Sequence, residues 1–414
     1  MSARARLALF SCTAAIAVGL SWWLVFGHVP WRCTIDLYQS YLAGELFARG
    51  QHDAIYHATF FADASTRAPA WAEGMARLGI PDDNHGTFAY GPIYLALITP
   101  LVLVTSLGMF STLVFAANAL AAVTLGVFSM RLAGEKSTRK QAVAGLVVGL
   151  LAPSVYAAML GQNVLIAIAL GVVAFDRLLA GRTALAIALL LLSCACKPWC
   201  AALLLVVPFV RGWRVFASAA LAYVVIFVAL PIALFPRAIV EGYAAVNRSL
   251  LTLSVLAFND VSVRAFVHRL SWPGWGVDIV TFRELHVGGR ALAVEVVLVV
   301  TIVASFVVGM VRARPRKPVI VAVACALSLV PLGVCWTHYL VATVPAIALS
   351  RTSAARAPRI AGLVQLAVLV SLHLFSRWIP SSATIAVAPA AFAIVFALPI
   401  VSTLALSATL VRSR

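Results

Sequence analysis

Cys33–Gln51 reads CTIDLYQSYLAGELFARGQ and directly follows the first long apolar run of the chain. Asp36 is the first acidic residue, and a helical pattern begins right after it. A carboxylate at a membrane edge, followed by a helix along the interface, faces both lipid and water. We therefore take this stretch as the centre of a functional site and the rest of the chain as its frame. The residues at helical spacing on one face are Tyr38, Tyr41, Leu42, Leu46 and Phe47.

The composition excludes a soluble globular protein. Of the 414 residues, 63% are hydrophobic and only 11% are charged, which leaves too little polar surface to face water. Apolar runs of about 18 residues or more recur along the chain, as membrane helices require. We therefore predict an all-α, polytopic helical membrane protein with a single integral membrane domain over residues 1–414. Residues 7–27 are expected to be an uncleaved first span, because the run is long and no A-x-A site follows it.

The order of apolar runs predicts about twelve spans and two long loops. The external loop 28–91 is expected to carry short interfacial helices, and the second external loop is 237–290. Residues 93–106 are expected to be re-entrant or kinked at Pro100. Two short spans meet at Lys197-Pro198, where proline suits a break. The spans are expected at about 7–27, 108–131, 141–160, 163–180, 183–196, 198–211, 215–236, 291–311, 318–336, 338–350, 360–376 and 386–411.

Charged residues are sorted between the two sides of the membrane. The net charge is +17, but the bases lie in short loops between spans, as in cytoplasmic loops, so nucleic acid is excluded as a partner. Seven of the fourteen acids lie in 28–91 and four in 237–290. We therefore expect a multi-pass protein of the inner membrane, with both termini cytoplasmic and the active site on the external face. The basic clusters are Arg4/Arg6, Arg131–Lys140, Arg177–Arg182, Arg211–Arg214, Arg312–Lys317, Arg351–Arg359 and Arg412–Arg414.

The cysteines and the absence of common enzyme motifs limit the kinds of reaction that the protein could catalyse. The seven cysteines lie mostly in apolar runs and indicate no disulfide framework. Cys194, Cys196 and Cys200 could suggest a metal, but no His or acid stands beside them, so we favour packing and predict no metal and no cofactor. The sequence has no Walker A, GxGxxG, HExxH or EF-hand motif. If the protein is an enzyme, its activated substrate should arrive through the membrane as a lipid.

Five polar residues are candidates for chemistry. Asp36 is either a general base for an acceptor hydroxyl or the N-cap of the following helix, and the two roles are compatible. Lys197 and His338 are polar within apolar runs, where ionisable residues are functional candidates. They could bind a phosphate, or Lys197 could snorkel and His338 could be a satisfied core residue. Gln162 and Asn163 either bind sugar hydroxyls or form a polar turn between spans.

These residues belong to a series of motifs whose order resembles glycosyltransferase family 87. Asp36 with Tyr38 and Tyr41 is similar to the family's acidic residue and aromatic helix after the first span. Three positions depart from the family pattern, namely Gly91, Cys335 and Tyr339. The other similar segments are Phe88–Ile93 (F-x-Y-P-P-L in the family), Gly161–Asn163 (G-Q-x-N), Lys197-Pro198 (K-P), Arg211–Arg214 (a basic loop with Trp) and Pro331–Tyr339 (S-P-x-S-W-x-H-H).

The resemblance implies a GT-C type fold and a function. Such enzymes transfer a sugar from a polyprenyl phosphate on the external face, by an inverting, metal-independent reaction. Asp36 would be the base, with His338 and Lys197 facing the donor phosphate. Mannose is the favoured sugar, a glycolipid or polysaccharide is the expected acceptor, and membrane lipids surround the protein. The expected substrate contacts are Lys197, Gln162, Asn163, Tyr38, Tyr41, Tyr90, Trp336 and Tyr339.

Other functions fit parts of this pattern. The same enzyme class includes transfer of arabinofuranose or another pentose. A transporter or flippase for a lipid-linked saccharide would favour internal repeats and ionisable residues near the middle of the membrane. A non-catalytic scaffold would have no need for polar residues that converge. Convergence of Asp36, Gln162, Lys197 and His338 around one external cavity would favour the enzyme.

Overall fold

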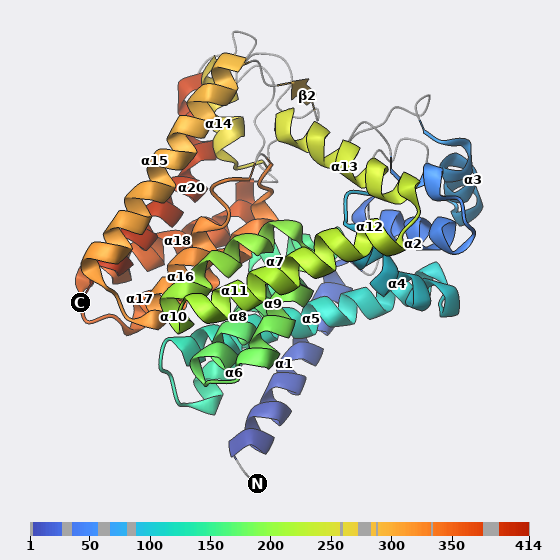
Figure 1. Ribbon diagram of the computed structural model, residues 1–414. Coiled ribbons are helices and arrows are strands. Elements are labelled where there is room, and N and C mark those ends of the chain that lie inside the picture. The colour runs from blue at the N-terminus through green and yellow to red at the C-terminus, as the bar shows by residue number, and fades with distance from the viewer. Residues whose placement is uncertain are drawn as a thin grey trace.

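The protein is a bundle of helices, shown in Figure 1 as a computed structural model. The structure describes residues 3–26, 35–56, 67–80, 88–256, 260–271, 283–286, 289–332, 334–375 and 389–413. A small antiparallel sheet pairs β1 (Leu253–Leu256) with β2 (Arg283–His286), with Leu253 opposite His286. The all-α prediction therefore holds for the bundle and misses this two-stranded sheet in the second loop.

Most expected helices are present, and several of them are short or broken. The break predicted at Lys197-Pro198 is confirmed, because α9 ends at Cys196 and a 3₁₀ segment, Pro198–Val206, follows. The chain forms α1 (Ala3–Phe26), α2 (Ile35–Ala48), α3 (Pro69–Leu78), α4 (Pro92–Val104), α5 (Leu107–Leu132), α6 (Thr138–Leu150), α7 (Ala152–Met159), α8 (Val164–Leu179), α9 (Thr183–Cys196), α10 (Val207–Arg211), α11 (Trp213–Val224) and α12 (Leu230–Leu234).

The C-terminal half also contains short and broken helices. A π-helical turn, Val225–Ala229, joins α11 to α12. The second loop contains two helices that the sequence pattern did not indicate, α13 and α14. The remaining elements are α13 (Arg237–Thr252), α14 (Val263–Ser271), α15 (Gly289–Ala313), α16 (Lys317–Leu327), the 3₁₀ segment Thr337–Thr343, α17 (Val344–Thr352), α18 (Arg356–Phe375) and α20 (Pro389–Arg412).

Four helices of the described residues are long and apolar enough to cross a membrane. A fifth span is counted if α6 and α7, bent by 58° at their junction, act as one. The protein is therefore a multi-pass membrane protein, while the count of about twelve remains a prediction. The apolar helix expected over 318–336 ends at Leu327. The four candidates are Ala5–Trp23, Leu107–Leu132, Trp213–Leu234 and Gly289–Ala313.

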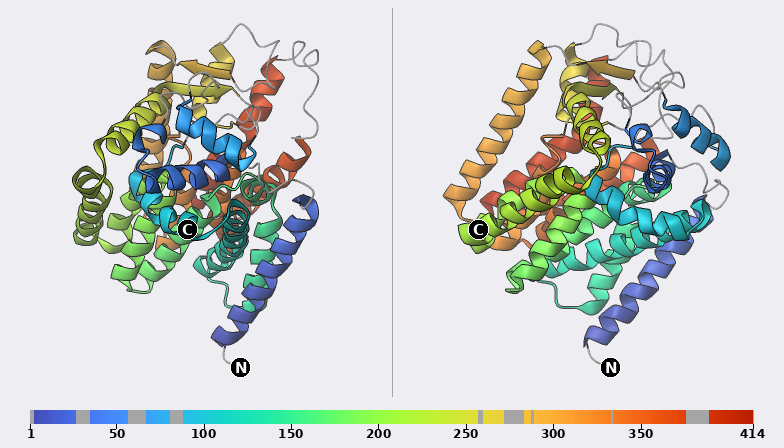
Figure 2. Two further views of the ribbon diagram at one scale, coloured as in Figure 1. Left: turned by 90° about the vertical axis from the view of Figure 1, so that its right-hand side faces the viewer. Right: turned by 45° about the vertical axis from the view of Figure 1, so that its right-hand side comes forward.

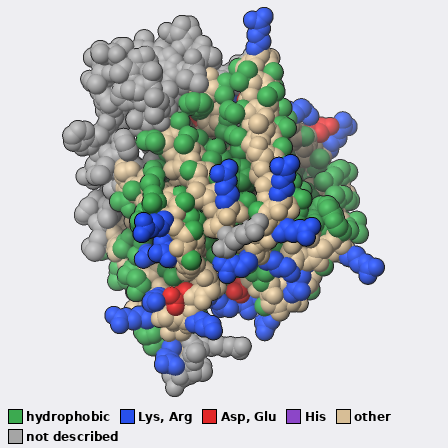
Figure 3. Space-filling model, turned by 90° about the vertical axis from the view of Figure 1, so that its left-hand side faces the viewer, with side chains coloured by type: hydrophobic (Ala, Val, Ile, Leu, Met, Phe, Trp, Pro, Cys, Tyr) green, Lys and Arg blue, Asp and Glu red, His purple; other side chains and the backbone are tan. Residues whose placement is uncertain are grey.

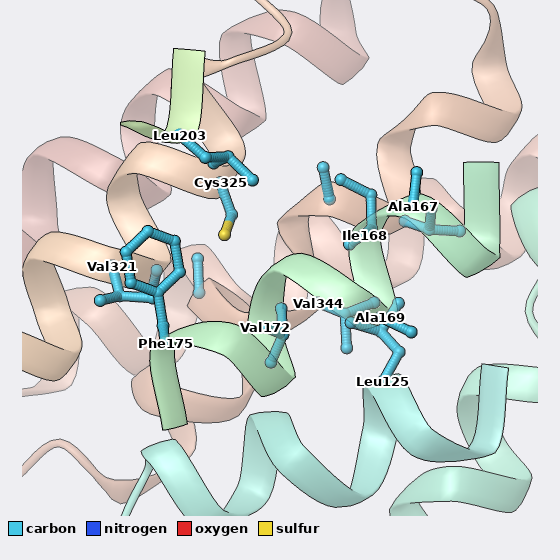
Figure 4. Close-up of a cluster of buried hydrophobic side chains, with 14 of the residues drawn as sticks. Leu125, Ala167, Ile168, Ala169, Val172, Phe175, Leu203, Val321, Cys325 and Val344 are labelled. Carbon is cyan, nitrogen blue, oxygen red and sulfur yellow. The ribbon is translucent and has the colours of Figure 1, made fainter. Parts of the chain in front are cut away.

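The main core lies where α5, α8, α16 and α17 meet. Figure 4 shows Leu125 of α5 close to side chains of α8 and to Val344 of α17. Small residues let α5 and α6 approach closely, because a Cβ on Gly126 would lie 2.5 Å from the carbonyl oxygen of Ala144. Trp22 ties α1 to this core, since its Nε1 donates to the carbonyl of Gly149 at 2.8 Å.

A second cluster of buried side chains lies beside the bundle and holds α2, α3, α4 and α13 together. Trp71, Tyr38 and Phe88 are almost fully buried there. Figure 1 and the right view of Figure 2 show α2 and α3 as a group to the right of the long helices. The Tyr56 hydroxyl donates to the carbonyl of Tyr90 at 2.8 Å, which joins the first loop to the start of α4. This cluster places Asp36, in the first turn of α2, against the bundle.

The surface combines apolar faces with basic side chains. In Figure 3, Lys and Arg side chains gather mainly in the middle and lower part of the face shown, and hydrophobic side chains cover much of the rest. Helix α15 shows its apolar side chains to the outside, with Val297 and Val300 more than half exposed. An apolar outer surface with basic side chains grouped in one region is typical of a protein that sits in lipid.

Candidate active site

Lys197 lies at the centre of a buried polar cluster. It follows α9 in an extended conformation, and Pro198 prevents the helix from continuing. Only 6% of the residue is exposed. Its Nζ donates to Gln162 Oε1 at 2.5 Å and to the Tyr90 hydroxyl at 3.2 Å. The ammonium also lies 4.7 Å from the ring centre of Tyr90 and 5.4 Å from that of Tyr339. We call Tyr90, Gln162, Lys197, His338 and Tyr339 the Lys197 cluster.

The turn between α7 and α8 supplies Gln162. Gly161 has a φ of +66°, which favours glycine, so the chain reverses there and Gln162 enters the interior. Gln162 and Asn163 are each 4% exposed. The side chain of Asn163 donates from Nδ2 to the carbonyl of Cys196 at 2.9 Å. Asn163 therefore fixes the residue directly before Lys197, and its predicted contact with substrate stays a prediction.

Asp36 reaches the same cluster from the first loop. Asp36 is partly buried. Because α2 begins at Ile35, Asp36 lies inside the first turn and is not the N-cap residue. Burial raises the pKa of the Asp36 carboxyl above its usual value, while the charge of Lys197 and a hydrogen bond with Gln162 act to lower it. Three residues that the sequence singled out in separate segments are therefore neighbours: Asp36, Gln162 and Lys197.

The two tyrosines of α2 lie in different surroundings. Tyr38 is 1% exposed and packs in the cluster formed by the first loop. The Tyr41 hydroxyl donates to the carbonyl of Thr105 at 2.9 Å, and its ring meets Phe110 edge-on at 5.6 Å. Tyr41 thus holds α2 against the end of α4 and the start of α5. Its described contacts are structural, and a contact with substrate stays a prediction.

His338 lies in the 3₁₀ segment Thr337–Thr343 and is 1% exposed. Its ring meets Tyr339 edge-on, with centroids 4.8 Å apart. Within the part of the chain that the structure describes, Nε2 of His338 is buried without a hydrogen-bond partner. Because Lys197 lies over the same Tyr339 ring, His338 belongs to the Lys197 cluster. Trp336 is half-buried two residues earlier, in an isolated antiparallel bridge with Asp260.

Asp260 holds the segment that leads to His338, a role that the sequence did not predict. Its Oδ1 accepts from the backbone N–H of Cys335 at 3.0 Å and of Ser262 at 2.9 Å. The N–H of Val261 donates to the carbonyl of Cys335 at 2.8 Å. Asp260 is fully buried, yet in the sequence it is one acid among several in a loop. Its partner lies 75 positions away, so local pattern gives no signal for this contact.

A buried ion pair supports the same region. Arg264 Nε lies 2.7 Å from Glu295 Oε2, and each side chain is 7% exposed. Arg264 also donates to the carbonyls of Leu250 and Leu253. The pair joins α14, α15 and the end of α13. The position of Glu295 is itself a signal of such a pair, because an acid inside an apolar span usually has a partner.

The family assignment rests on one comparison. The sequence profile of glycosyltransferase family 87 matches residues 88–335, which is more than half of the chain. The chain belongs to glycosyltransferase family 87. The matched residues include Tyr90, Gln162 and Lys197, while Asp36 and His338 lie outside the match. No curated protein and no solved structure matches the chain significantly.

Membership in the family makes this protein a glycosyltransferase of the membrane. Such an enzyme acts on a sugar donor and an acceptor. Among the described residues, no group of three or more His, Cys, Asp or Glu side chains is placed to hold a metal ion. Cys194 and Cys200 are buried in the main core, as the packing interpretation expected.

Proposed function

We propose that the protein transfers a sugar from a polyprenyl phosphate to a lipid or glycan acceptor at the external face of the inner membrane. The reaction inverts the anomeric centre, and Asp36 is the general base. Mannose is the first candidate for the sugar, with a pentose such as arabinofuranose as the alternative. The Lys197 cluster binds the donor phosphate in this proposal.

The observation that carries the proposal is a buried lysine that forms no ion pair with a carboxylate of the described residues, although Asp36 lies close enough for the two charges to interact. No carboxylate oxygen of the described residues lies within 4.0 Å of Lys197 Nζ, whose hydrogen bonds go to uncharged groups. Buried charges in proteins are normally paired, because their desolvation is costly. A phosphate beside Nζ would supply a direct ion-pair partner. His338 Nε2, buried and without a described partner, is a second group available to such a ligand.

Asp36 suits the role of base because it lies beside the phosphate-binding groups. A hydroxyl that attacks the anomeric carbon loses its proton, and the leaving phosphate gains negative charge. In this proposal the hydroxyl attacks the anomeric carbon from the side opposite the phosphate in a single displacement, which inverts the anomeric centre. A positioned base contributes about 10²–10⁴-fold to rate, and donors that bind the leaving phosphate act most strongly in the transition state.

The arrangement also supports the external placement of the reaction. The base comes from loop 28–91, where acids are frequent, and the basic loops lie elsewhere in the sequence. A polyprenyl tail can remain in lipid while its phosphate reaches the Lys197 cluster.

The test compares donors with the purified protein in lipid nanodiscs. Polyprenyl-phosphate mannose, polyprenyl-phosphate arabinofuranose and a nucleotide-linked mannose are each supplied with membrane acceptors. We expect transfer from a polyprenyl-phosphate sugar, none from the nucleotide sugar, and a product with the opposite anomeric configuration by NMR. Transfer from the nucleotide sugar, or retention of configuration, would contradict the proposal. In a parallel experiment with the protein in sealed vesicles, movement of intact donor across the membrane without transfer would favour a flippase.

A further inference from the structure

Trp199 has a buried polar atom that has no role in the proposed reaction and no hydrogen bond among the described residues. It lies two residues after Lys197, in the 3₁₀ segment Pro198–Val206. Its indole Nε1 is buried and has no hydrogen-bond partner among the described residues. An indole N–H is only a donor, and buried tryptophans usually place it on an acceptor. The position of Nε1 therefore calls for an acceptor that the described part of the chain does not provide.

Trp199 shares one neighbour with both proposed phosphate ligands. The Trp199 ring lies 5.7 Å from the Tyr339 ring at an angle of 36°. Lys197 Nζ lies 5.4 Å from the centre of the same ring, and the His338 ring meets it edge-on at 4.8 Å. Three nitrogen-bearing side chains thus surround Tyr339. Nε1 of Trp199 and Nε2 of His338 have no described partner, and no carboxylate of the described residues lies within the 4.0 Å of an ion pair with Lys197.

A packing role accounts for the ring of Trp199 but not for its N–H. The side chain is partly buried against the main core, where a phenylalanine or leucine would also fill space. If the position needed only an apolar ring, tryptophan would be a poor choice, because its buried Nε1 donor would have no acceptor. An anionic ligand beside Lys197 would satisfy the ammonium and the indole N–H together.

We propose that Trp199 is a third donor to the leaving phosphate of the polyprenyl donor, an inference that rests on the proposed function. In the reaction the bond between the anomeric carbon and the phosphate oxygen breaks, and its electron pair stays on that oxygen. The acceptor oxygen bonds to the anomeric carbon and its proton goes to Asp36. The phosphate changes from a singly charged diester to a doubly charged monoester. A neutral N–H donor therefore binds the product phosphate more strongly than the substrate phosphate.

The test uses Trp199→Phe, which keeps an aromatic ring against Tyr339 and removes the N–H. Three quantities are measured: the kcat and KM of transfer, inhibition by a polyprenyl phosphate and by the matching polyprenol, and the midpoint of thermal unfolding. Trp213→Phe is the control, because Trp213 is 70% exposed. We expect Trp199→Phe to lower kcat about 10–100-fold. Inhibition by the polyprenyl phosphate should weaken by about tenfold, with inhibition by the polyprenol and the unfolding midpoint unchanged.

Different outcomes separate the two proposals. If wild type transfers sugar and is inhibited more strongly by the phosphate than by the polyprenol, but Trp199→Phe behaves the same, the role of Trp199 is wrong and the proposed function stands. If wild type neither transfers sugar nor distinguishes the two lipids, both are wrong. Should Trp199→Phe fail to fold, benzothienylalanine at position 199 replaces it, since sulfur takes the place of the N–H in a ring of the same shape. The same losses are then expected, and full activity would overturn the inference.

Discussion

Replacement of Lys197 by methionine should separate stability from activity. Methionine has a similar length and no charge, so Lys197→Met removes the ammonium and keeps most of the packing. The substitution loses two hydrogen bonds and the contacts with the rings of Tyr90 and Tyr339. It also removes the desolvation cost of a buried ion, which is several kcal/mol. The Tyr90 hydroxyl already lies 3.4 Å from Gln162 Oε1, so each remaining polar atom keeps a partner.

Together, these losses and gains predict that Lys197→Met is as stable as wild type or more stable. Each lost cation–π contact is worth up to about 2 kcal/mol when desolvated, and replacement of buried ions by apolar side chains is often neutral or stabilising by about 1–4 kcal/mol. Without the Lys197 charge the pKa of Asp36 rises further, which favours the protonated form of the carboxyl. We expect the free energy of unfolding of Lys197→Met to lie between the wild-type value and about 3 kcal/mol above it.

Transfer activity should fall although the fold persists. Loss of one charge-stabilising group at a reacting phosphate typically costs about 10²–10³-fold in kcat. The assays are thermal unfolding in nanodiscs and initial rates of transfer. The control is Lys140→Met, since the Lys140 side chain is 70% exposed and a surface change should alter stability by about 0.5 kcal/mol at most. A Lys197→Met protein that is less stable than wild type by more than about 1 kcal/mol and loses activity only in proportion to unfolding would refute this reasoning.

Three further predictions address the base, the core and the second loop. An active base must be ionised, and burial raises the pKa of Asp36, so kcat/KM should rise with pH along an acid limb that lies above pH 3.8. The hydrogen bond with Gln162 lowers this pKa, so Gln162→Leu should move the acid limb of the pH–rate profile to higher pH. Gly126→Ala should lower the free energy of unfolding by about 1–3 kcal/mol, because its Cβ would meet backbone of α6, while Gly19→Ala, with nothing within 4 Å, should cause no loss in the same melt. Arg264→Met leaves Glu295 buried without its ion partner and should cost about 3–5 kcal/mol, whereas replacement of both residues by apolar ones should restore most of that stability in denaturation experiments.

The sequence predicted the elements whose cause is local. Proline after Lys197 ends a helix wherever the helix packs, so the break at the end of α9 was predictable. The first span and the helix after Asp36 follow from apolar periodicity in the same way. The polar residues inside apolar runs, Lys197 and His338, also stood out without knowledge of the fold.

The contacts that the sequence did not predict join distant segments. Asp260 binds the backbone of Cys335, and Arg264 pairs with Glu295, so neither contact leaves a pattern in one stretch. The helix expected over 318–336 stops at Leu327, four residues before Pro331, a local helix-breaking signal that the long apolar run concealed. Tyr41 was grouped with Tyr38 because both lie on one face of α2. A single turn of helix nevertheless places them in separate clusters, against different neighbours.

The central claim is that Asp36 is the base of a transfer from a polyprenyl-phosphate sugar. Since burial opposes ionisation of this carboxyl, Asp36→Asn should fold at neutral pH at least as stably as wild type. The most direct measurement is transfer of labelled mannose from polyprenyl-phosphate mannose to membrane acceptors by wild type and by Asp36→Asn, with the pentose donor run in parallel. We predict that wild type transfers sugar from one of these donors and that the folded variant loses at least about 10²-fold in rate. Undiminished transfer by a folded Asp36→Asn would contradict the account.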